Sequence, residues 1–385
     1  MMKVAYILDA FPKISETFIL NEMVELQRQG VTVEVFAFYN PKEGLCHRQT
    51  EEIKRVNYFQ NEALFEIIVS HVWFLFHRPL GYAKVIWFSI RCRNDFFRLF
   101  VTQLKNVRLI ELSCPNHIQA HFGHRAADMA MMTHLLTGIP FTFSLLGYDI
   151  FVCPPRNIKI KCALAKGVTT ITNFNRSYIV KQFGVSSEKI SVIRCGVDLT
   201  KNVIKGVSSE NIILSVARFE YVKGVDVLVK ACSLLKKAGV QFKCLIVGDG
   251  SQYEILKELI KDFDLEDEVK LLGYKTQDQV YELLSKARIK VLSSRSESLG
   301  VALIEAMAMR VPVIGPAVNG VSELIKDGES GFLVPPDRED LLAEKINLLL
   351  ENEGLRSGFA GAAYKTIVEE YNLEIEVGKL INLFY

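Results

Sequence analysis

Short apolar runs alternate with longer segments of helical periodicity along most of this 385-residue chain. Short apolar runs bounded by turn residues are typical of buried strands, whereas apolar residues that recur every three or four positions are typical of helices. On this basis we predict strands at 3–8, 31–38, 118–121, 141–144, 167–172, 190–193, 212–217, 242–247, 269–272, 289–292, 311–314 and 332–334. Strands that alternate with helices in this way favour parallel sheets covered by helices on both faces.

The pattern divides into two α/β halves. Between the two runs of strand–helix alternation the chain turns polar at 195–206, and we interpret this segment as the hinge. The part of the first half that precedes strand 118–121 is mostly helical and irregular. Ligands of sheets of this kind bind beyond the carboxyl ends of the strands. The loops that follow the strands are therefore the places where we expect the chemistry.

Two glutamates, Glu297 and Glu305, lie on either side of a point where a strand gives way to a helix. The strand ends near Ser294, Gly300 lies at the turn, and strong helix formers follow from Val301. The first amides of a helix have no partner within it and carry the positive end of the helix dipole, so they bind anions. Carboxylates on both sides can reach hydroxyl groups that flank a bound phosphate. The pattern therefore predicts a sugar nucleotide at this turn.

Two cations, Arg218 and Lys223, lie in the loop after strand 212–217. Arginine offers a planar fork and lysine a compact charge, and together they suit a diphosphate leaving group whose charge grows during reaction. Either cation alone would more often be a solvated surface charge. Their position together, upstream of the two-glutamate loop, favours a role in binding a diphosphate.

These motifs resemble those of a known enzyme family. The runs Val-Ala-Arg-Phe-x3-Lys-Gly-x-Asp at 216–226 and Ile-Arg-Cys-Gly-Val-Asp at 193–198, with the spaced glutamates, are similar to the retaining GT-B glycosyltransferases of family 4. The runs Phe-Pro-Lys-Ile-Ser-Glu-Thr-Phe-Ile at 11–19 and Gln-Ala-His-Phe-Gly at 119–123 resemble the branch that builds bacterial exopolysaccharides of the colanic acid and amylovoran kind. The resemblance extends over nearly the whole chain.

The resemblance implies a fold and a division into domains. The fold is α/β, with two Rossmann-like doubly wound domains that face each other across a cleft. We accordingly expect an acceptor-binding domain at 1–198 and a domain that binds the nucleotide-sugar donor at 199–368. A C-terminal helix at 369–385 is expected to cross back to the first domain.

The resemblance also implies roles for particular residues. The expected catalytic set is Glu297, His121 and Asp149, in which Glu297 binds the hydroxyls of the donor sugar and orients its anomeric carbon. Glu305 is expected to hold the ribose hydroxyls, and Tyr274 to lie near the base. The full expected donor-binding set is Arg218, Lys223, Gly300, Glu305, Tyr274 and Thr17. The implied mechanism is front-face attack, in which the leaving phosphate accepts the proton of the acceptor.

Leu146 departs from the family pattern. Relatives usually carry a histidine here, followed closely by the acidic residue that Asp149 matches. Leucine cannot stabilise charge, so either His121 and Asp149 suffice, or the acceptor supplies the missing group, or the activity is weakened or lost. The loop before the first helix also lacks the paired glycines of the wider family, which leaves Ser15 to cap that helix and Thr17 to meet the diphosphate.

Three histidines, His117, His121 and His124, are closely spaced. A zinc site would need their rings to converge and further ligands to join them. No acidic or cysteine partner is placed nearby to help, so we predict no metal site. His121 lies at the carboxyl end of a predicted strand and is either a residue of the ligand cleft or a purely structural histidine.

Residues 63–108 combine basic and large apolar side chains. Seven basic residues stand against Glu66 and Asp95, and both tryptophans of the chain lie here. The segment is either a pair of core-facing helices with solvated basic backs or a surface that rests on an anionic membrane. Its apolar runs are shorter than the ~20 residues that span a bilayer. The first residues read as a strand, so we expect no signal peptide.

Overall charge and cysteine usage add little constraint. The net charge of +2 gives no indication of a nucleic-acid partner, although residues 1–200 hold 23 basic and 16 acidic residues. The eight cysteines include no Cys-x-x-Cys pair, which fits free thiols in a reducing cytoplasm. We therefore expect a cytoplasmic protein, peripheral at the inner face of the cell membrane where residues 63–108 make contact.

The predicted function is that of a retaining, metal-independent glycosyltransferase without a cofactor. It would move a hexose from a nucleoside diphosphate sugar to a lipid-linked oligosaccharide or polysaccharide acceptor in bacterial cell-surface polysaccharide synthesis. Two alternatives remain. One is a sugar phosphate synthase or epimerase of the same fold. The other is a non-catalytic nucleotide-sugar-binding partner of another transferase, which only Leu146 supports.

Overall fold

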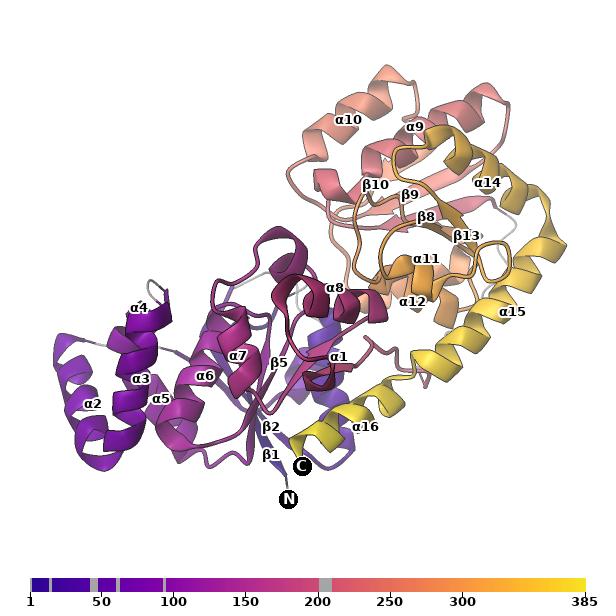
Figure 1. The fold of residues 1–385 in the computed structure, drawn as a ribbon. Coiled ribbons are helices and arrows are strands. Elements are labelled where there is room, and N and C mark those ends of the chain that lie inside the picture. The colour runs from indigo at the N-terminus through magenta and orange to yellow at the C-terminus, as the bar shows by residue number, and fades with distance from the viewer. Residues whose placement is uncertain (1, 14–15, 42–47, 60–62, 93–94, 201–209) are drawn as a thin grey trace. The chain divides into compact units, whose positions relative to one another are not determined.

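The computed structural model describes residues 2–13, 16–41, 48–59, 63–92, 95–200 and 210–385. The chain forms two compact units (Figure 1). Unit 1 comprises Met1–Ile193 together with Glu374–Tyr385, and unit 2 comprises Arg194–Leu373. Ser15 and the 201–206 part of the expected hinge lie outside the described residues.

Unit 1 is built on a parallel sheet of seven strands in the order β3-β2-β1-β4-β5-β6-β7. The strands are β1 (Lys3–Ala10), β2 (Thr32–Tyr39), β3 (Val56–Tyr58), β4 (His117–His121), β5 (Phe141–Ser144), β6 (Gly167–Thr170) and β7 (Ile190–Val192). The central strands are buried on both faces, which explains why β1 reads as an almost continuous apolar run.

Helices cover this sheet, and most of them come directly after a strand in the chain. They are α1 (Thr17–Arg28), α6 (Arg125–Thr137), α7 (Ile158–Leu164), α8 (Asn173–Phe183) and α16 (Leu373–Phe384), with the short turns η1 (Arg48–Glu52), η2 (Tyr148–Val152) and η3 (Ser187–Lys189). Helix α6 is buried almost all round, because it lies between the sheet and a further layer of helices.

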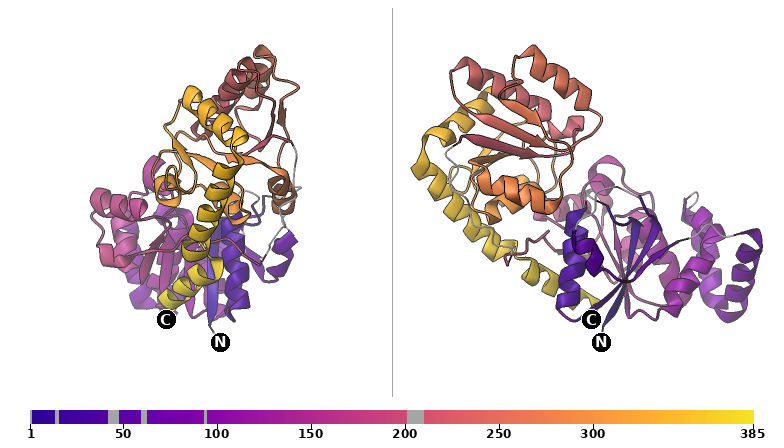
Figure 2. Two further views of the ribbon diagram at one scale, coloured as in Figure 1. Left: turned by 90° about the vertical axis from the view of Figure 1, so that its right-hand side faces the viewer. Right: turned by 180° about the vertical axis from the view of Figure 1, so that it is seen from behind.

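That further layer is inserted between β3 and β4. It consists of α2 (Leu64–His77), α3 (Pro79–Cys92), α4 (Asp95–Thr102) and α5 (Leu104–Leu112). Helix α3 crosses α6 closely at Gly81, where a Cβ atom would lie 2.7 Å from the carbonyl oxygen of Leu135. Helix α2 is the outermost element of this layer and contacts α3 and α5 (Figure 1, Figure 2).

Helix α16 belongs to unit 1 although it follows the whole of unit 2 in the chain. Gln29 Nε2 donates to the Glu374 carbonyl oxygen at 2.9 Å, and Lys166 Nζ donates to the Phe384 carbonyl oxygen at 3.0 Å. The Phe384 ring lies 4.8 Å from the imidazole of His117 in β4. The apolar face of α16 is thus buried against the first unit.

Unit 2 is built on a six-stranded parallel sheet in the order β10-β9-β8-β11-β12-β13. The strands are β8 (Ile212–Val216), β9 (Lys243–Val247), β10 (Val269–Leu271), β11 (Ile289–Val291), β12 (Val313–Pro316) and β13 (Phe332–Val334). The helices are α9 (Val225–Lys237), α10 (Tyr253–Asp262), α11 (Gln277–Lys286), α12 (Val301–Ala308), α13 (Val321–Leu324), α14 (Glu339–Glu351) and α15 (Glu353–Glu370), with the turn η4 (Tyr221–Lys223). Helices α9 and α14 cover one face of the sheet, and α11 and α12 cover the other.

The predicted fold class, two parallel-sheet Rossmann-like α/β domains, is confirmed. Every strand predicted from the sequence is present, with ends that differ by at most two residues. Strand β3 was not predicted. It is a three-residue edge strand whose side chains are only partly buried, so it carries no apolar run.

In both units the strand order reverses at one place. Strand β1 lies between β2 and β4 in unit 1, and β8 lies between β9 and β11 in unit 2. The helices after the two strands at such a point leave on opposite faces of the sheet, so their loops diverge and leave room for a ligand. The loops after β1, β4, β8 and β11 are therefore the candidate site positions.

Candidate functional site

In unit 2 the loop after β8 is joined directly to the loop after β11. Ser293 Oγ donates to the Gly224 carbonyl oxygen at 2.7 Å, and the Arg295 amide donates to the Val222 carbonyl oxygen at 2.8 Å. Gly224 ends η4 with a φ of +58° and precedes the first turn of α9. A Cβ atom on Gly224 would lie 2.1 Å from the Ser293 carbonyl oxygen, so this close approach requires glycine.

This junction brings together two residues that the sequence analysis assigned to different roles. Lys223 Nζ lies 2.6 Å from Glu297 Oε2, and the two side chains are 18% and 15% exposed. The hydroxyl of Ser294 lies 3.3 Å from the same carboxylate oxygen. In this structure the cation expected to bind the diphosphate is therefore paired with the carboxylate expected to bind the sugar.

Arg218 lies at the carboxyl end of β8, in the same loop as Lys223, and is exposed. Its guanidinium makes no hydrogen bond or ion pair with the residues that the structure describes. Its charge contributes to holding the pKa of Glu220 below the usual value, after the larger effect of the hydrogen bonds from Ser251. The Arg218 side chain is therefore available to an anion beside the Lys223–Glu297 pair.

Gly300 is the N-cap residue of α12, with a φ of +83° and no side chain that caps the helix. Glu305 lies one turn into this helix, and its Oε1 accepts a hydrogen bond from Gln277 Nε2 of α11 at 3.0 Å. The same Gln277 amide lies 3.2 Å from the Tyr281 hydroxyl. The carboxylate of Glu305 is thus oriented from the facing helix.

The glycine turn after β9 packs against the loop after β8. Gly248 has a φ of +144°, and a Cβ atom there would lie 1.8 Å from the Ala217 carbonyl oxygen. Its amide donates to the Gly273 carbonyl oxygen at 3.1 Å. Tyr274, which follows Gly273 after β10, is 43% exposed. Tight contact between loops accounts for Gly248, and Tyr274 presents an accessible ring at the same edge of the sheet.

Lys290, in β11, was not assigned a role from the sequence. Its side chain is fully buried, and among the described residues its Nζ has no hydrogen-bond partner. Burial lowers the pKa of Lys290 from 10.5 to about 7, although the charge of Glu305 acts in the opposite direction. The buried amine of Lys290 thus interacts electrostatically with the Glu305 carboxylate on α12. In the sequence, the only indication of a buried amine was the position of this lysine inside a predicted strand.

In unit 1, His121 lies at the carboxyl end of β4 and is 2% exposed. Its Nε2 donates to Glu22 Oε1 of α1 at 2.9 Å, and the Tyr6 hydroxyl donates to the same oxygen at 2.6 Å. Phe18 packs edge-on against the imidazole, with ring centroids 6.2 Å apart. Glu22 was not predicted as a site residue. The signal that could have identified it is an acidic residue on the inward face of an amphipathic helix.

Asp149 is completely buried and accepts three backbone hydrogen bonds. Its Oδ2 accepts from the Gly123 amide at 2.8 Å, and its Oδ1 accepts from the amides of Leu146 and Gly147 at 3.0 Å. Burial raises the pKa of Asp149, and these backbone hydrogen bonds oppose that shift. The carboxylate therefore joins the loop after β4 to the loop after β5.

Leu146 is buried, and its carbonyl oxygen accepts from Asn175 Nδ2 at 2.7 Å. Thr17 is the first residue of α1, and the N-cap residue Glu16 makes no side-chain capping hydrogen bond. The first amides of α1 thus lie beyond the carboxyl end of β1, at the place where the strand order reverses. Within the described ranges, no three His, Cys, Asp or Glu side chains are grouped so that they could hold a metal ion.

Comparison with known proteins finds a family match in the second half of the chain. Residues 199–366 match the family model of glycosyl transferases group 1. The chain is 28% identical over 366 residues to WcaL of Salmonella typhimurium, which is named for a glycosyltransferase role in colanic acid biosynthesis, with 90% of each chain covered. It is 35% identical over 209 residues to the amylovoran biosynthesis glycosyltransferase AmsK of Erwinia amylovora, with 52% of this chain and 51% of AmsK covered.

The solved structures extend the likeness of fold to both units. The structure of HepE from Anabaena, in complex with UDP and glucose, superimposes with a TM-score of 0.77 and 19% identity, and 99% of each chain is covered. Residues 199–366 thus match the model of group 1 glycosyl transferases, and the whole chain shares the fold of HepE and is similar to a glycosyltransferase named for colanic acid biosynthesis.

Proposed function

We propose that this chain is a retaining glycosyltransferase that moves a hexose from a nucleoside diphosphate sugar to a membrane-borne, lipid-linked oligosaccharide or a polysaccharide. The observation that carries the proposal is the arrangement at the reversal point of unit 2. There the Lys223–Glu297 pair, the exposed Arg218 and the first amides of α12 lie on adjoining loops. The similarity to proteins named for colanic acid and amylovoran biosynthesis supports cell-surface polysaccharide synthesis as the setting.

In the proposed mechanism Arg218 and Lys223 bind the diphosphate, helped by the amides that follow Gly300. Negative charge grows on the leaving phosphate as the bond from the anomeric carbon to the phosphate oxygen breaks, and fixed positive groups stabilise it. Lys223 exchanges the Glu297 carboxylate for the phosphate, which frees Glu297 to accept hydrogen bonds from the sugar hydroxyls. We infer that these groups supply the charge that a metal ion would otherwise provide.

In the proposed front-face mechanism the acceptor attacks the anomeric carbon from the face that the phosphate leaves, and this retains the configuration. The acceptor oxygen forms its bond to the anomeric carbon, and its proton passes to the departing phosphate oxygen. Glu305 would hold the ribose hydroxyls, with its orientation set by Gln277. Tyr274 would lie beside the base because it is exposed next to the glycine turn.

The residues of unit 1 receive more indirect roles. Asp149 has both carboxylate oxygens engaged by backbone amides, so we propose that it shapes the loops after β4 and β5. His121 has Nε2 engaged by Glu22, so only its Nδ1 remains to meet a ligand. The first amides of α1, at Thr17, are a further site for phosphate oxygens. The buried side chain of Leu146 is apolar and offers a ligand neither charge nor a hydrogen bond. We propose that His121 and the first amides of α1 supply these interactions instead.

The donor assignment is tested by calorimetric binding of a panel of nucleoside diphosphate sugars to wild-type protein and to Lys223→Met. We expect tight binding of one donor by wild-type protein and an affinity lower by about tenfold or more in the variant. Product analysis with a lipid-linked acceptor then separates transfer from a sugar phosphate synthase or an epimerase. If folded wild-type protein binds none of the donors, the transferase proposal is wrong. Binding without turnover would identify the non-catalytic alternative.

The exposed apolar face of helix α2 supports the proposal that the acceptor is borne by a membrane. It buries only Ser70 and Phe74, and its opposite side carries an exposed apolar face. That face consists of Leu64, Phe65, Ile68, Val69, Val72, Leu75 and Phe76, which are between 45% and 76% exposed. A helix that is apolar on all sides is normally buried in protein or placed in lipid. No helix in the described part of the chain combines the length and apolarity that crossing a membrane requires.

Two arginines lie over the tryptophan rings of α2 and α3, and Glu66 of α2 is paired with a lysine. Arg108 lies over the Trp73 ring at 4.5 Å, and Arg91 lies over the Trp87 ring at 5.0 Å. Glu66 is paired with Lys105 at 2.5 Å. Arginine beside tryptophan and an apolar helix face is the chemistry of an interface with anionic phospholipid. We therefore propose that the α2 face lies on an anionic bilayer at the inner face of the cell membrane.

Vesicle sedimentation tests this surface separately from the donor site. Wild-type protein is expected to bind phosphatidylglycerol-containing vesicles more tightly than pure phosphatidylcholine vesicles. The variant Phe65→Ser/Phe76→Ser should lose binding, whereas Ile255→Ser should retain it, because Ile255 is a 52% exposed apolar residue in unit 2. Equal loss in both variants, or no binding by wild-type protein, would remove the membrane proposal and leave the donor assignment intact.

A further inference from the structure

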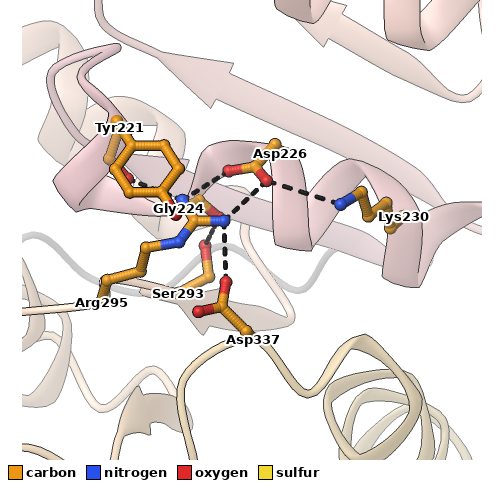
Figure 3. Close-up of polar contacts among 7 residues, drawn as sticks. All are labelled: Tyr221, Gly224, Asp226, Lys230, Ser293, Arg295 and Asp337. Carbon is orange, nitrogen blue, oxygen red and sulfur yellow. Dashed lines mark hydrogen bonds and ion pairs between the residues drawn. The ribbon is translucent and has the colours of Figure 1, made fainter.

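Arg295 joins three loops at the carboxyl edge of the unit 2 sheet (Figure 3). It lies in the loop after β11, and its guanidinium makes a two-pronged contact with Asp226, with distances of 2.9 and 2.8 Å. The same group donates to the Tyr221 carbonyl oxygen at 2.7 Å and pairs with Asp337, in the loop after β13, at 2.7 Å. The Tyr221 ring covers the guanidinium at 4.0 Å.

These contacts hold the residues that precede and follow Lys223 in the chain. Tyr221 and Val222 precede it, and both of their carbonyl oxygens accept hydrogen bonds from Arg295. Gly224 follows it and accepts from Ser293. The backbone of Lys223 is thus held on both sides, while its side chain reaches Glu297, two positions beyond Arg295.

Arg295 itself is poorly placed to bind a ligand. Its side chain is 13% exposed, and both terminal nitrogens are already engaged by Asp226, Asp337 and Tyr221. Burial pushes the pKa of Asp226 upward, but the hydrogen bonds and charge of Arg295 outweigh this and hold that pKa below its usual value. The guanidinium therefore stays occupied, and its effect on a ligand must pass through the loops that it joins.

We propose that Arg295 is a positioning residue of the donor site, which holds the loop after β8 against the loop after β11 so that Lys223 faces Glu297 before a donor arrives. The reaction that this positioning serves rests on the proposed function above. A lysine whose backbone is fixed needs only a side-chain movement to exchange the carboxylate for a phosphate. Order established before binding lowers the conformational entropy lost on binding.

Amide hydrogen exchange tests the structural half of this proposal without any ligand. In Arg295→Met we expect peptides that span 221–224 to exchange about tenfold faster or more, and in Arg295→Lys we expect an intermediate rate, because one ammonium cannot span Asp226, Asp337 and the Tyr221 carbonyl. The control is Arg310→Met. Arg310 also lies over a tyrosine ring, that of Tyr364 at 3.7 Å, but it precedes β12 at the opposite edge of the sheet. Unchanged exchange at 221–224 in Arg295→Met would overturn the proposal.

The functional half is tested by combining variants and measuring the affinity for nucleoside diphosphates. If Arg295 acts through Lys223, then Lys223→Met should cost much less affinity in the Arg295→Met background than in wild-type protein. Additive losses, with faster exchange, would show that Arg295 supports the fold but does not position Lys223. If wild-type protein binds no nucleoside diphosphate, the proposed function fails, and the exchange experiment alone decides whether Arg295 orders this loop.

Discussion

Glu22 of α1 and His121 of β4 are joined by a hydrogen bond of 2.9 Å, and the carboxylate oxygen that accepts it also accepts from Tyr6. Burial, followed by the charge of Glu22, raises the pKa of Tyr6 well above its usual value, so the phenol remains a donor. The variant Glu22→Gln keeps an acceptor but removes its charge. We expect a loss of about 1–3 kcal/mol in the free energy of unfolding of unit 1, measured by urea denaturation. Glu51→Gln, at an exposed carboxylate, should change it by less than about 0.5 kcal/mol. Equal effects would contradict a role for Glu22 in holding His121.

The two glutamates of unit 2 should separate nucleotide binding from sugar transfer. Glu305→Gln is expected to weaken binding of the nucleoside diphosphate alone by about tenfold, because a charged acceptor for ribose hydroxyls is lost. Glu297→Gln should leave that affinity unchanged or improve it, since Lys223 no longer has a competing carboxylate. The same variant should lower turnover by about 10²–10³. Calorimetry and product assays check both, and the reverse pattern would exchange the two assigned roles.

Gly224 should be far less tolerant of substitution than Gly239. Both have positive φ, +58° and +75°, but a Cβ atom at Gly239 meets nothing within 4 Å. Gly239→Ala is therefore expected to cost only the left-handed backbone strain, about 1–2 kcal/mol. Gly224→Ala adds the collision with the Ser293 carbonyl oxygen, so we expect more than about 3 kcal/mol and weaker binding of nucleoside diphosphates. Similar losses of unfolding free energy in both variants would show that the loops do not approach as closely as described.

His117 should make unit 1 sensitive to acid. Burial, with a smaller effect of Lys166, lowers the pKa of His117 from 6.5 to about 3. Below about pH 6.5 the imidazole is protonated in the unfolded chain but stays neutral in the folded chain. The free energy of unfolding therefore decreases by up to about 1.4 kcal/mol for each pH unit as the pH is lowered from 6.5 to 3. His117→Gln should reduce this slope between pH 6.5 and 4, and His77→Gln, at an exposed histidine, should not. An unchanged slope in His117→Gln would assign the acid sensitivity to other groups.

Lys290 should reduce stability at neutral and lower pH. Because its pKa is lowered to about 7 in the folded chain, the unfolded chain binds the extra proton between about pH 7 and 10.5, and stability rises with pH across that window. Below pH 7 the buried ammonium is charged. Lys290→Met replaces a buried group that has no hydrogen-bond partner among the described residues, so it should raise the unfolding free energy of unit 2 by about 1–4 kcal/mol at pH 7. It should also remove the rise at higher pH. Destabilisation by Lys290→Met would indicate that the lysine is needed for its interaction with Glu305.

The strands were predictable because parallel strands are buried on both faces and read as apolar runs. That signal is a property of each segment, and it failed only for β3, whose residues are partly exposed at the edge of a sheet. The insertion α2–α5 was recognised as helical. Which side of α2 is exposed could not be predicted, because that helix is apolar on all sides.

The positions of the candidate residues relative to the strands were predictable from the sequence, but the contacts between these residues were not. Arg218, Lys223, Glu297 and Glu305 follow strand ends, and this is visible in the sequence. The Lys223–Glu297 contact depends on β8 and β11 being neighbours, although β9 and β10 separate them in the chain. The contacts of Arg295 with Asp226 and Asp337 depend on the same strand order and were therefore not predicted.

Helix α16 has a consequence for the order in which the chain acquires its structure during synthesis. Its buried residues Val377, Leu380 and Phe384 complete unit 1, yet the ribosome makes them only after all of unit 2. Domains generally fold as units, with the N-terminal one first. Here the first unit must wait with His117 and Lys166 uncovered until the second has been translated. Chaperones would therefore meet unit 1 while its core still lacks α16.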